Sequence, residues 1–444
     1  MPSAITEWPA WIEHTKADPK HAQDPVYLSA KRAVLAEYGA EALQKSWLAV
    51  CAQLEAVTAD IAVRGSSAIP VHEAADVVGP DGLSAAAQAE IKKRGCVVIR
   101  QVLPRSEAEQ LYADLQTYVA DNRDVIRGWP ADSPSMLILY DSPTQNAIRG
   151  HPNQLQVQRQ LNGFWHDDNN TEADPTSSEP LIFFDGVRDR PSRQEFIGLG
   201  PHIDAGSLSR WADPAYRHSY ANVFNGSPER HDCYDLGVRK QAQQALFPAT
   251  AHSTVFRSFQ GWTALTPTGP RAGTMLLYPD VQSAIAYVLL RPFFRPPADP
   301  SQIMDASKWT IVDPTDQDGW FPGTNKNNSQ MLSRSSHPHL RLEDCLVHVP
   351  ALQPGDTVWW HTDVCHAVEP EHIGPTNASV VYVPACPTTA INKAYVKRQL
   401  AATTNGQVPP DYMRGNDLDE TKLKGYVGHG GLSEEAKAAF GYYL

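Results

Sequence analysis

The chain has 444 residues, of which 42% are hydrophobic, so it can bury a sizeable core as one large domain with insertions or as two ordinary domains. Its formal net charge of -12 and its sequence pI near 5.7 argue against a general nucleic-acid binder or a binder of anionic membranes. We therefore expect a small-molecule substrate as the partner.

The cysteines and the N-terminal residues indicate a compartment. The six cysteines are scattered and form no C-x-x-C pair, which argues against a disulfide framework and against a thiolate zinc site. Residues 1–14 are polar and lack the basic and apolar stretches of a signal peptide, and no segment approaches about 18 uninterrupted apolar residues. We expect a soluble cytoplasmic protein that binds neither nucleic acid nor membrane.

The first quarter of the chain is predicted to be mainly helical. Apolar residues recur there at spacings of three and four, and glycines mark the helix ends. The predicted elements are, in order, two helices over Pro25–Val63 that break near Gly39, a helix over Ala85–Arg94 that ends at Gly95, a buried strand over Cys96–Ile99, and a helix from Ser106 to roughly Val119.

The remainder is predicted to consist mainly of short strands joined by turns rich in proline and glycine. The predicted strands are Pro180–Phe184, Phe196–Leu199, Thr254–Leu265, Thr274–Tyr278, Ala284–Leu290, Leu346–Val349, Thr357–His361 and Ser379–Pro384. The predicted helices are Pro152–Phe164, Lys393–Ala402 and Ser433–Phe440. Two stretches without periodicity are interpreted as an insertion that covers a metal edge (Ser209–Pro248) and as a long exposed loop (Pro296–Pro338).

These elements predict an α+β, mainly β fold, with a sandwich or jelly roll fed by N-terminal helices. We expect three regions. They are an N-terminal helical region (1–94), a jelly-roll domain (95–400) with insertions near 209–250 and 296–338, and a C-terminal extension (401–444).

One short motif suggests a metal site. His202 and Asp204 are two residues apart in an extended apolar run, so their side chains point to the same face and can reach one ion. A third ligand is expected from the segment Gly355–His366, where His361 and His366 are both candidates. Two histidines and one carboxylate on one face form the facial triad of non-haem Fe(II) oxygenases. Alone, H-x-D is a weak motif, and a histidine in such a segment is often only a hydrogen-bonded core residue.

Several further pieces occur together in a specific order. They are Cys96–Arg100 before a helix, Leu199-Gly-Pro-His-Ile-Asp-Ala-Gly-Ser207, Phe256-Arg-Ser-Phe-Gln-Gly-Trp-Thr-Ala-Leu265, Gly273–Pro279, Leu290-Arg-Pro-Phe293, Trp359–Pro370 and Tyr382-Val-Pro-Ala-Cys-Pro387. In these pieces the sequence resembles the jelly-roll Fe(II)/2-oxoglutarate oxygenases related to phytanoyl-CoA dioxygenase, and more closely their YbiU-like branch, a domain of unknown function.

The resemblance implies a double-stranded β-helix (jelly-roll or cupin-like) core and an oxidoreductase of the dioxygenase type. It makes His202, Asp204 and His366 the iron ligands and catalytic residues, with 2-oxoglutarate and O2 as cosubstrates. His361 then falls where relatives carry a histidine that supports the strand. Hydroxylation of a small organic molecule, or a related C–H oxidation, is the activity that the resemblance implies.

One departure concerns the cosubstrate. The oxygenases usually anchor the distal carboxylate of 2-oxoglutarate with an arginine or lysine shortly after the last histidine ligand, yet Ala367–Pro387 contains neither residue. A guanidinium suits a carboxylate because it offers two parallel donors. Arg257 is the first candidate for this role, and its alternative is a structural ion pair. The remaining candidates are Arg210, Arg291 and Lys393.

The tryptophans of this region are candidates for the cavity wall, although large rings on strands more often belong to the core. They are Trp211, Trp262, Trp359 and Trp360, of which we place Trp262 beside the cosubstrate. Asp363 is expected either to orient an imidazole or to cap a turn.

Two other functions remain open from the sequence. The absence of a basic residue after His366 favours a metal-dependent jelly-roll enzyme that works without 2-oxoglutarate, such as an isomerase, a lyase or an oxidase. A non-catalytic small-molecule binder that keeps the fold is the other alternative. An intact triad argues against that binder, because a binding module does not need three metal ligands.

Overall fold

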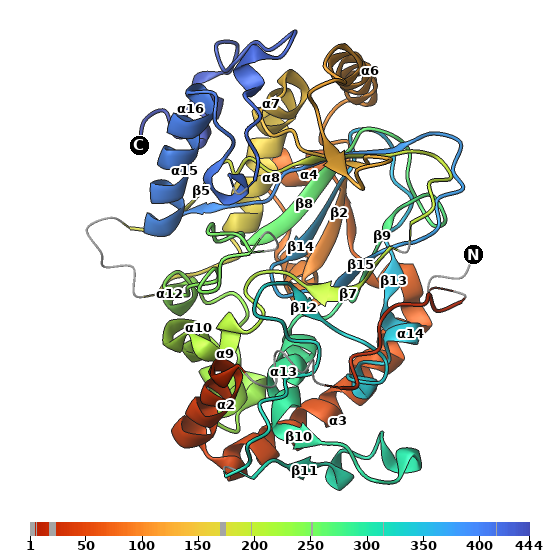
Figure 1. Ribbon diagram of the computed structural model, residues 1–444, viewed down its shortest axis with the longest axis vertical. Helices are drawn as coiled ribbons and strands as arrows, with labels where there is room; N and C mark the ends of the chain where they lie inside the picture. Colours follow the sequence, from red (N-terminus) through yellow and green to blue (C-terminus); the bar gives the residue numbers. More distant parts are fainter. Residues whose placement is uncertain are drawn as a thin grey trace.

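Two sheets of short strands lie at the centre of the molecule (Figure 1). The computed structural model describes residue 5 and residues 7–16, 24–168, 175–196, 198–249, 252–313, 315–413 and 415–444. The larger sheet has eight strands in the spatial order β1 (Val71–Glu73), β2 (Cys96–Arg100), β14 (Thr357–His361), β8 (Phe259–Ala264), β16 (Ala378–Tyr382), β6 (Val187–Arg190), β4 (Met136–Leu137) and β3 (Gly128–Trp129).

The smaller sheet has five strands, in the order β12 (Gln330–Met331), β7 (Leu199–Ile203), β15 (His366–Val368), β9 (Met275–Leu277) and β13 (Val347–His348). Two further pairs complete the strands of the described residues, β10 (Phe294–Arg295) with β11 (Thr310–Ile311) and β17 (Pro387–Thr388) with β5 (Ser177–Pro180). The fold is therefore mixed α/β, with several sheets, none of which closes on itself within the described ranges.

Successive strands pass from one sheet to the other. β6, β8, β14 and β16 belong to the larger sheet, whereas β7, β9, β13 and β15 belong to the smaller one. As a result, strands that are remote in sequence become neighbours. β15 pairs antiparallel with β7 and places His366 directly opposite His202.

The central strands of the larger sheet are buried along their whole length. β14 has the sequence Thr-Val-Trp-Trp-His and is covered on both faces, as are the first four residues of β2, beside which it lies. On its other side β14 pairs with β8, where Gly261 is opposite Trp359. The indole fills the place of a side chain at Gly261, since a Cβ there would lie 2.4 Å from Trp359 Cε3.

Replacing Gly261 with alanine should therefore overpack the sheet and lower the free energy of unfolding by about 1–3 kcal/mol, measured by urea denaturation. Gly430 is the matched control, because it is exposed and a Cβ there meets no atom within 4 Å. If Gly261→Ala and Gly430→Ala changed the stability equally, the packing of Trp359 against Gly261 would not be the cause.

The N-terminal helices agree with the prediction. α2 (Pro25–Tyr38) and α3 (Ala40–Arg64) break at Gly39, whose φ of 82° favours glycine. α5 (Ala85–Arg94) ends at Gly95 in the left-handed conformation and leads into β2, and α6 (Arg105–Asp121) follows. Outside residues 209–248, the other helices of the described residues are α4 (Ala74–Val78), α7 (Pro143–Arg149), α8 (Pro152–Asn162), α13 (Gln282–Leu290), α14 (Leu342–Cys345), α15 (Ala390–Thr404) and α16 (Glu434–Phe440).

The prediction of a strand at Ala284–Leu290 is wrong, because these residues form most of α13. From Ser283 to Leu290 every residue of this helix is buried, so the apolar run carries no period that separates a helix from a strand. α3 packs against α13, with the Trp47 ring stacked 5.3 Å from that of Tyr287.

The stretch Ala40–Ala68, which comprises α3 and the turn after it, is long and apolar enough to cross a membrane by length and composition alone. In this structure its residues Leu43, Trp47, Val50 and Leu54 are buried in the hydrophobic core. One such stretch is weak evidence for a membrane span, because a helix that contributes to a protein core passes the same test.

The two stretches without periodicity take different structures. The first forms four short helices, α9 (Ser209–Ala212), α10 (Pro214–His218), α11 (Ala221–Phe224) and α12 (Leu236–Arg239). The second contains β11 and short 3-10 helices, but it also supplies β12, which pairs with β7 at the edge of the smaller sheet. The interpretation of 296–338 as only an exposed loop is therefore wrong, although Pro314 of this stretch is outside the described residues.

Two further strand predictions are wrong, because Pro180 is the one residue of Pro180–Phe184 that lies in a strand, and Leu199 is the one described residue of Phe196–Leu199 that does so. The remaining predicted strands are right in place, and most of them differ in length. β8 begins only at Phe259, β5 ends at Pro180, and β7 begins at Leu199, while Ile197 of the predicted strand Phe196–Leu199 is outside the described residues. One hydrophobic core contains residues from Trp11 to Leu423 and so spans all three predicted regions. The boundaries at 94 and 400 stay a prediction.

Candidate metal centre

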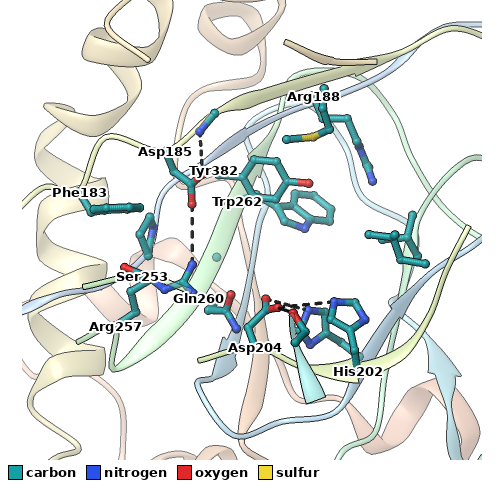
Figure 2. Close-up of a pocket in the computed structure, with 18 of the residues that line it drawn as sticks. Phe183, Asp185, Arg188, His202, Asp204, Ser253, Arg257, Gln260, Trp262 and Tyr382 are labelled. Atoms are coloured by element: carbon teal, nitrogen blue, oxygen red, sulfur yellow. Dashed lines mark hydrogen bonds and ion pairs between the residues drawn. The ribbon is translucent and has the colours of Figure 1, made fainter. Parts of the chain in front are cut away.

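A cavity of about 530 Å³ lies between the two sheets (Figure 2). The larger sheet contributes side chains from β6, β8, β14 and β16, and the smaller sheet contributes side chains from β7, β9, β12 and β15. The polar and aromatic residues of its wall include Arg188, His202, Asp204, Arg257, Gln260, Trp262, Ser329, Trp360, His366 and Tyr382.

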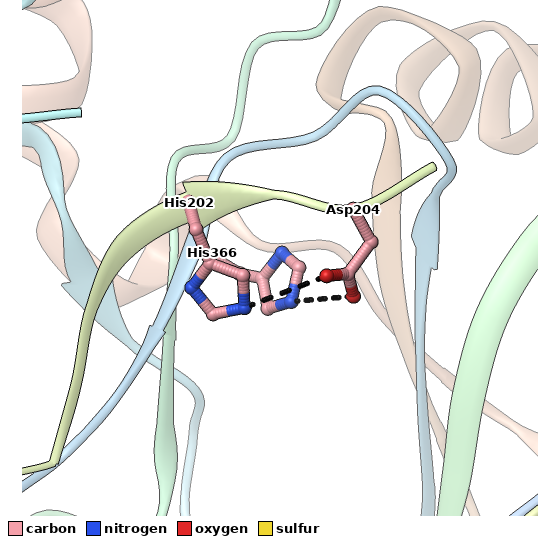
Figure 3. Close-up of side chains that lie close together, drawn as sticks. All are labelled: His202, Asp204 and His366. Carbon is pink, nitrogen blue, oxygen red and sulfur yellow. Dashed lines mark ion pairs between the residues drawn. The ribbon is translucent and has the colours of Figure 1, made fainter. Parts of the chain in front are cut away.

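The pairing of β7 with β15 brings the predicted triad together on one wall of this cavity (Figure 3). The imidazole rings of His202 and His366 have centroids 4.1 Å apart. Asp204 directly follows β7, with its Oδ1 3.8 Å from His202 Nε2 and its Oδ2 3.5 Å from His366 Nε2. One donor atom from each residue lies within 4.8 Å of the other two, so these three residues could hold a metal ion.

The orientation of both imidazoles suits metal coordination. His202 Nδ1 lies 2.8 Å from the carbonyl of Gly200, and His366 Nδ1 lies 3.1 Å from the carbonyl of Val364. A carbonyl only accepts hydrogen bonds, so each Nδ1 carries a proton, and in the neutral ring the lone pair is on Nε2, which lies on the side of Asp204. Metal-bound histidines in proteins are usually oriented in this way.

Both oxygens of Asp204 are also held by hydrogen bonds. Ser329 Oγ donates to Oδ1 at 2.7 Å. The hydrogen-bond network places the amide nitrogen of Gln260 2.9 Å from Oδ2 and its amide oxygen 3.2 Å from Trp360 Nε1. Ser329, just before β12, and Gln260, on β8, thus fix the orientation of the Asp204 carboxylate, and Trp360 on β14 in turn holds Gln260.

The charges of the triad fit an ion as well. Burial, together with the nearby His366, lowers the pKa of His202 to about 4 although Asp204 opposes this shift. Burial by itself raises the pKa of Asp204, but the two imidazoles and Arg257 outweigh it and hold this pKa well below its ordinary value. At neutral pH the donor set is therefore a carboxylate with a neutral His202, which is what a divalent metal requires.

His361 occupies a different position. It ends β14 in the larger sheet, where Nε2 lies 3.0 Å from the carbonyl of Cys233 and Nδ1 accepts a hydrogen bond from the amide of Asp363. Its ring stacks on Trp165 with centroids 4.8 Å apart. Both nitrogens are occupied, so this imidazole has no lone pair for a metal.

Behind the triad, Asp363 forms a buried ionic cluster. Arg239 donates to both of its oxygens at 3.0 Å, and Arg210 Nη2 lies 3.2 Å from Oδ1. Arg210 Nη2 also donates to the backbone carbonyl of Asp204 at 2.7 Å. The Asp363 carboxylate therefore anchors a cluster that supports the turn after β7, and it is the backbone amide of Asp363 that bonds to an imidazole, that of His361.

The candidates for the cosubstrate clamp lie in different places. Arg257 lines the cavity, and its Nη1 is 3.9 Å from Asp185 Oδ2. Arg210 is fully buried in the Asp363 cluster, outside the cavity lining. Arg291 donates to the carbonyls of Ser336 and Phe294, and Lys393 belongs to α15. Arg257 is thus the one of the four that faces the triad across the cavity.

The tryptophans divide in the same way. Trp262 and Trp360 line the cavity, whereas Trp211 and Trp359 are fully buried in the core. Arg188, Gln260 and Ser329 also line the cavity but were not identified from the sequence. Arg188 lies on β6, where the pattern Val-Arg-Asp-Arg has no apolar run that would have revealed a buried strand. Ser329 lies in a stretch without periodicity, just before β12.

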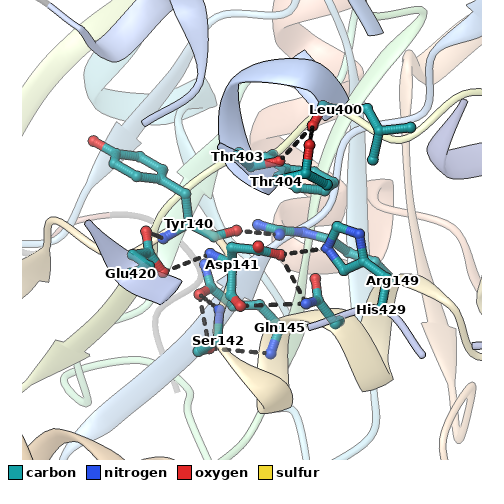
Figure 4. A network of polar contacts seen from close by, with 12 residues as sticks. Tyr140, Asp141, Ser142, Gln145, Arg149, Leu400, Thr403, Thr404, Glu420 and His429 are labelled. Carbon is teal, nitrogen blue, oxygen red and sulfur yellow. Dashed lines mark hydrogen bonds and ion pairs between the residues drawn. The ribbon is translucent and has the colours of Figure 1, made fainter. Parts of the chain in front are cut away.

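The C-terminal segment is held against Tyr140 and Asp141 by a network of polar contacts (Figure 4). Glu420 accepts hydrogen bonds from the amides of Tyr140 and Asp141, at 2.7 and 2.9 Å, and His429 Nε2 lies 2.7 Å from Asp141 Oδ1. Tyr140 and Tyr412, whose rings stack at 4.3 Å, both line the cavity. Burial raises the pKa of Glu420 to about 7, although the two amides oppose this shift.

This buried carboxyl predicts a specific pH dependence of stability. The pKa of Glu420 is higher in the folded chain than its ordinary value of 4.5, so the folded state binds the proton more tightly. Its contribution is fully present below about pH 4.5 and is lost as the pH rises to about 7, at a total cost of up to about 3 kcal/mol. Urea denaturation at both ends of this range should show a loss of stability with rising pH that is larger in the wild type than in Glu420→Gln, by up to about 3 kcal/mol. Other buried groups, such as Asp280, whose pKa burial raises to about 6, contribute to the slopes of both proteins.

Glu109→Gln is the control for the Glu420 experiment, because Glu109 is exposed on α6 and forms a surface ion pair with Arg105. Its slope should follow that of the wild type. Equal slopes for Glu420→Gln and the wild type would contradict the raised pKa.

The described residues thus define a mixed α/β protein with a buried His-Asp-His group at a cavity between two sheets. Residues 24–442 match the family described as Gig2-like, and the chain belongs to this family. It is 31% identical over 391 residues to the uncharacterized protein YbiU of Escherichia coli (strain K12). The aligned region covers 85% of this chain and 86% of YbiU.

Solved structures show the same fold. GlcNAc inducible gene 2 (GIG2) of Candida albicans matches with a TM-score of 0.83 at 23% identity, over 98% of this chain and 90% of that one. A hypothetical protein of Escherichia coli, JW0805, matches with a TM-score of 0.79 at 28% identity, over 97% of this chain and all (100%) of that one.

Proposed function

We propose that this protein is a non-haem Fe(II)- and 2-oxoglutarate-dependent oxygenase that oxidises a C–H bond of a small organic molecule. The observation that carries the proposal is the buried group of His202, Asp204 and His366, with both Nε2 atoms and the carboxylate directed to one point. Two imidazoles and one carboxylate on one face suit Fe(II) with open positions.

The order of strands supports the double-stranded β-helix that such enzymes use. Eight strands, β6 to β9 and β13 to β16, are divided evenly between the two sheets, and the cavity lies between those sheets. The triad comes from β7, the residue after it and β15, so two paired inner strands of the smaller sheet would hold the metal rigidly.

In this proposal His202, Asp204 and His366 hold Fe(II). When bound, Fe(II) with 2-oxoglutarate supplies the activation of O2 for C–H oxidation. Ser329 and Gln260 keep the Asp204 carboxylate oriented through hydrogen bonds to separate oxygens. The aromatic walls from Trp262, Trp360 and Tyr382 exclude water and position the substrate carbon.

All six cysteines are buried and unpaired, which supports the expected cytoplasmic location. The cavity volume of about 530 Å³ supports a small molecule as the substrate.

A second candidate is a metal-dependent enzyme that works without 2-oxoglutarate. The observation in its favour is the segment Ala367–Pro387, which follows the last triad residue and contains no arginine or lysine. This candidate shares the metal but not the cosubstrate, so one experiment separates the two.

The test is an anaerobic titration of the protein with Fe(II), followed by 2-oxoglutarate. We expect stoichiometric Fe(II) binding and then a weak visible metal-to-ligand charge-transfer band when 2-oxoglutarate is added. Fe(II) binding without the band would favour the second candidate. No Fe(II) binding would rule out both.

A further inference from the structure

Arg188 is a buried guanidinium for which the fold supplies little compensation. It lies on β6, is 6% exposed, and donates one hydrogen bond, from Nη2 to the carbonyl of Gly273 at 3.1 Å. Its Nε has no hydrogen-bond partner, and none of the ion pairs among the described residues includes Arg188. A buried charge without an ionic partner is costly, so such a residue points to a missing anion.

The sheet directs this side chain into the cavity. Arg188 is opposite Val380 in the pairing of β6 with β16, and residues directly opposite each other point to the same face. On that face of β16, two residues on, Tyr382 lines the cavity. Figure 2 shows the Arg188 guanidinium directed into the open space on the side of the triad.

Arg257, the other arginine of the cavity wall, is compensated differently. Its Nη1 lies 3.9 Å from Asp185 Oδ2, and its charge also acts on the carboxylates of Asp204 and Asp411. An anion at Arg257 would have to compete with these carboxylates. An anion at Arg188 would meet none of them within ion-pair distance.

We infer that Arg188 anchors the distal carboxylate of 2-oxoglutarate, an inference that rests on the proposed function. The strand that follows the last histidine ligand, β16, carries no basic residue, and Arg188 comes from the neighbouring strand at the same face of the sheet. The guanidinium then supplies the fork of donors from β6 that Ala367–Pro387 lacks.

The experiment compares two 2-oxo acids of equal chain length. 2-Oxopentanoate ends in a methyl group where 2-oxoglutarate ends in a carboxylate, so the ratio of their dissociation constants isolates the distal carboxylate. We expect the Fe(II)-loaded wild type, titrated anaerobically, to prefer 2-oxoglutarate by about 30-fold or more. Arg188→Gln should reduce this preference to within about threefold while its Fe(II) affinity is unchanged.

Further variants separate anchoring from a structural role. Arg188→Lys keeps the charge without the fork and should retain an intermediate preference, whereas Arg271→Gln, at an exposed ion pair with Glu371, should behave as the wild type. If Arg188→Gln kept the full preference, or if Arg257→Gln lost it and Arg188→Gln did not, the inference would be overturned.

A metal-free measurement separates this inference from the proposed function. Glutarate, a five-carbon dicarboxylate, is added to the protein in EDTA and the Tm is measured. If the wild type binds no Fe(II) but glutarate raises its Tm and not that of Arg188→Gln, Arg188 is an anion anchor and the oxygenase proposal fails alone. If glutarate raises neither Tm and no Fe(II)-dependent preference exists, Arg188 has no anchoring role.

Discussion

Replacing His202 or Asp204 with alanine should lower the affinity for Fe(II) by roughly 100-fold or more and abolish 2-oxoglutarate turnover. Each substitution removes one donor of three, and the two remaining donors leave the ion to water. The loss of Fe(II) affinity should be large because, among the described residues, no other acidic or imidazole group joins this cluster and could replace the missing ligand. His202 is also buried, with 7% of its surface exposed. Fe(II) binding is measured by anaerobic calorimetry and turnover by succinate formation.

His361→Ala is the matched control for the triad variants. His361 lies only five residues before His366 and is equally buried, yet both of its nitrogens bond to backbone groups. We expect this variant to keep Fe(II) binding but to lose about 2–5 kcal/mol of stability, because the carbonyl of Cys233 and the amide of Asp363 lose their partner. Loss of Fe(II) binding in His361→Ala with intact binding in His202→Ala would show that the triad is wrong.

Asp363→Asn should lower the free energy of unfolding by about 3–5 kcal/mol, measured by urea denaturation. Burial raises the pKa of Asp363, but Arg239 and Arg210 outweigh this effect and hold it well below its ordinary value. The carboxylate therefore stays ionised throughout the neutral range. Its neutral replacement leaves two buried guanidinium groups, on Arg210 and Arg239, without a counter-charge.

The control for Asp363→Asn is an ion pair at the surface. Arg105 and Glu109 pair at 2.8 Å on α6, and both side chains are more than half exposed. Glu109→Gln should change the stability by less than about 1 kcal/mol, because water screens the pair. Similar effects for the two substitutions would mean that the Asp363 cluster contributes no more than a surface pair.

The sequence predicted the N-terminal half of the helical structure well because its signals are local. Gly39 and Gly95 end helices where a positive φ is needed, and apolar residues at spacings of three and four define the buried faces of α2 and α3. The predicted ends of β14 agree with the observed ones, because this apolar strand lies between two turns that define where it begins and ends.

Other elements could not be predicted because their signals are not local. α13 is buried on almost every side, so its apolar run has no helical period. β6 has two arginines in four residues, and it is a strand only because β16 and β4 pair with it. β12 lies in a polar stretch and forms at the edge of the smaller sheet beside β7.

By itself, the sequence determined that His202 and Asp204 share one face, because residues at i and i+2 of an extended strand must do so. The spacing of residues in Gly355–His366 left both His361 and His366 as candidates for the third ligand, and the family resemblance favoured His366. The tertiary structure separates them. β14 ends at His361 in the larger sheet, and the chain then crosses to β15 in the smaller sheet, where His366 meets His202. It also brings Arg188, Gln260 and Ser329 to the same cavity. Long-range strand pairing decides these positions, and no local pattern of residues encodes it.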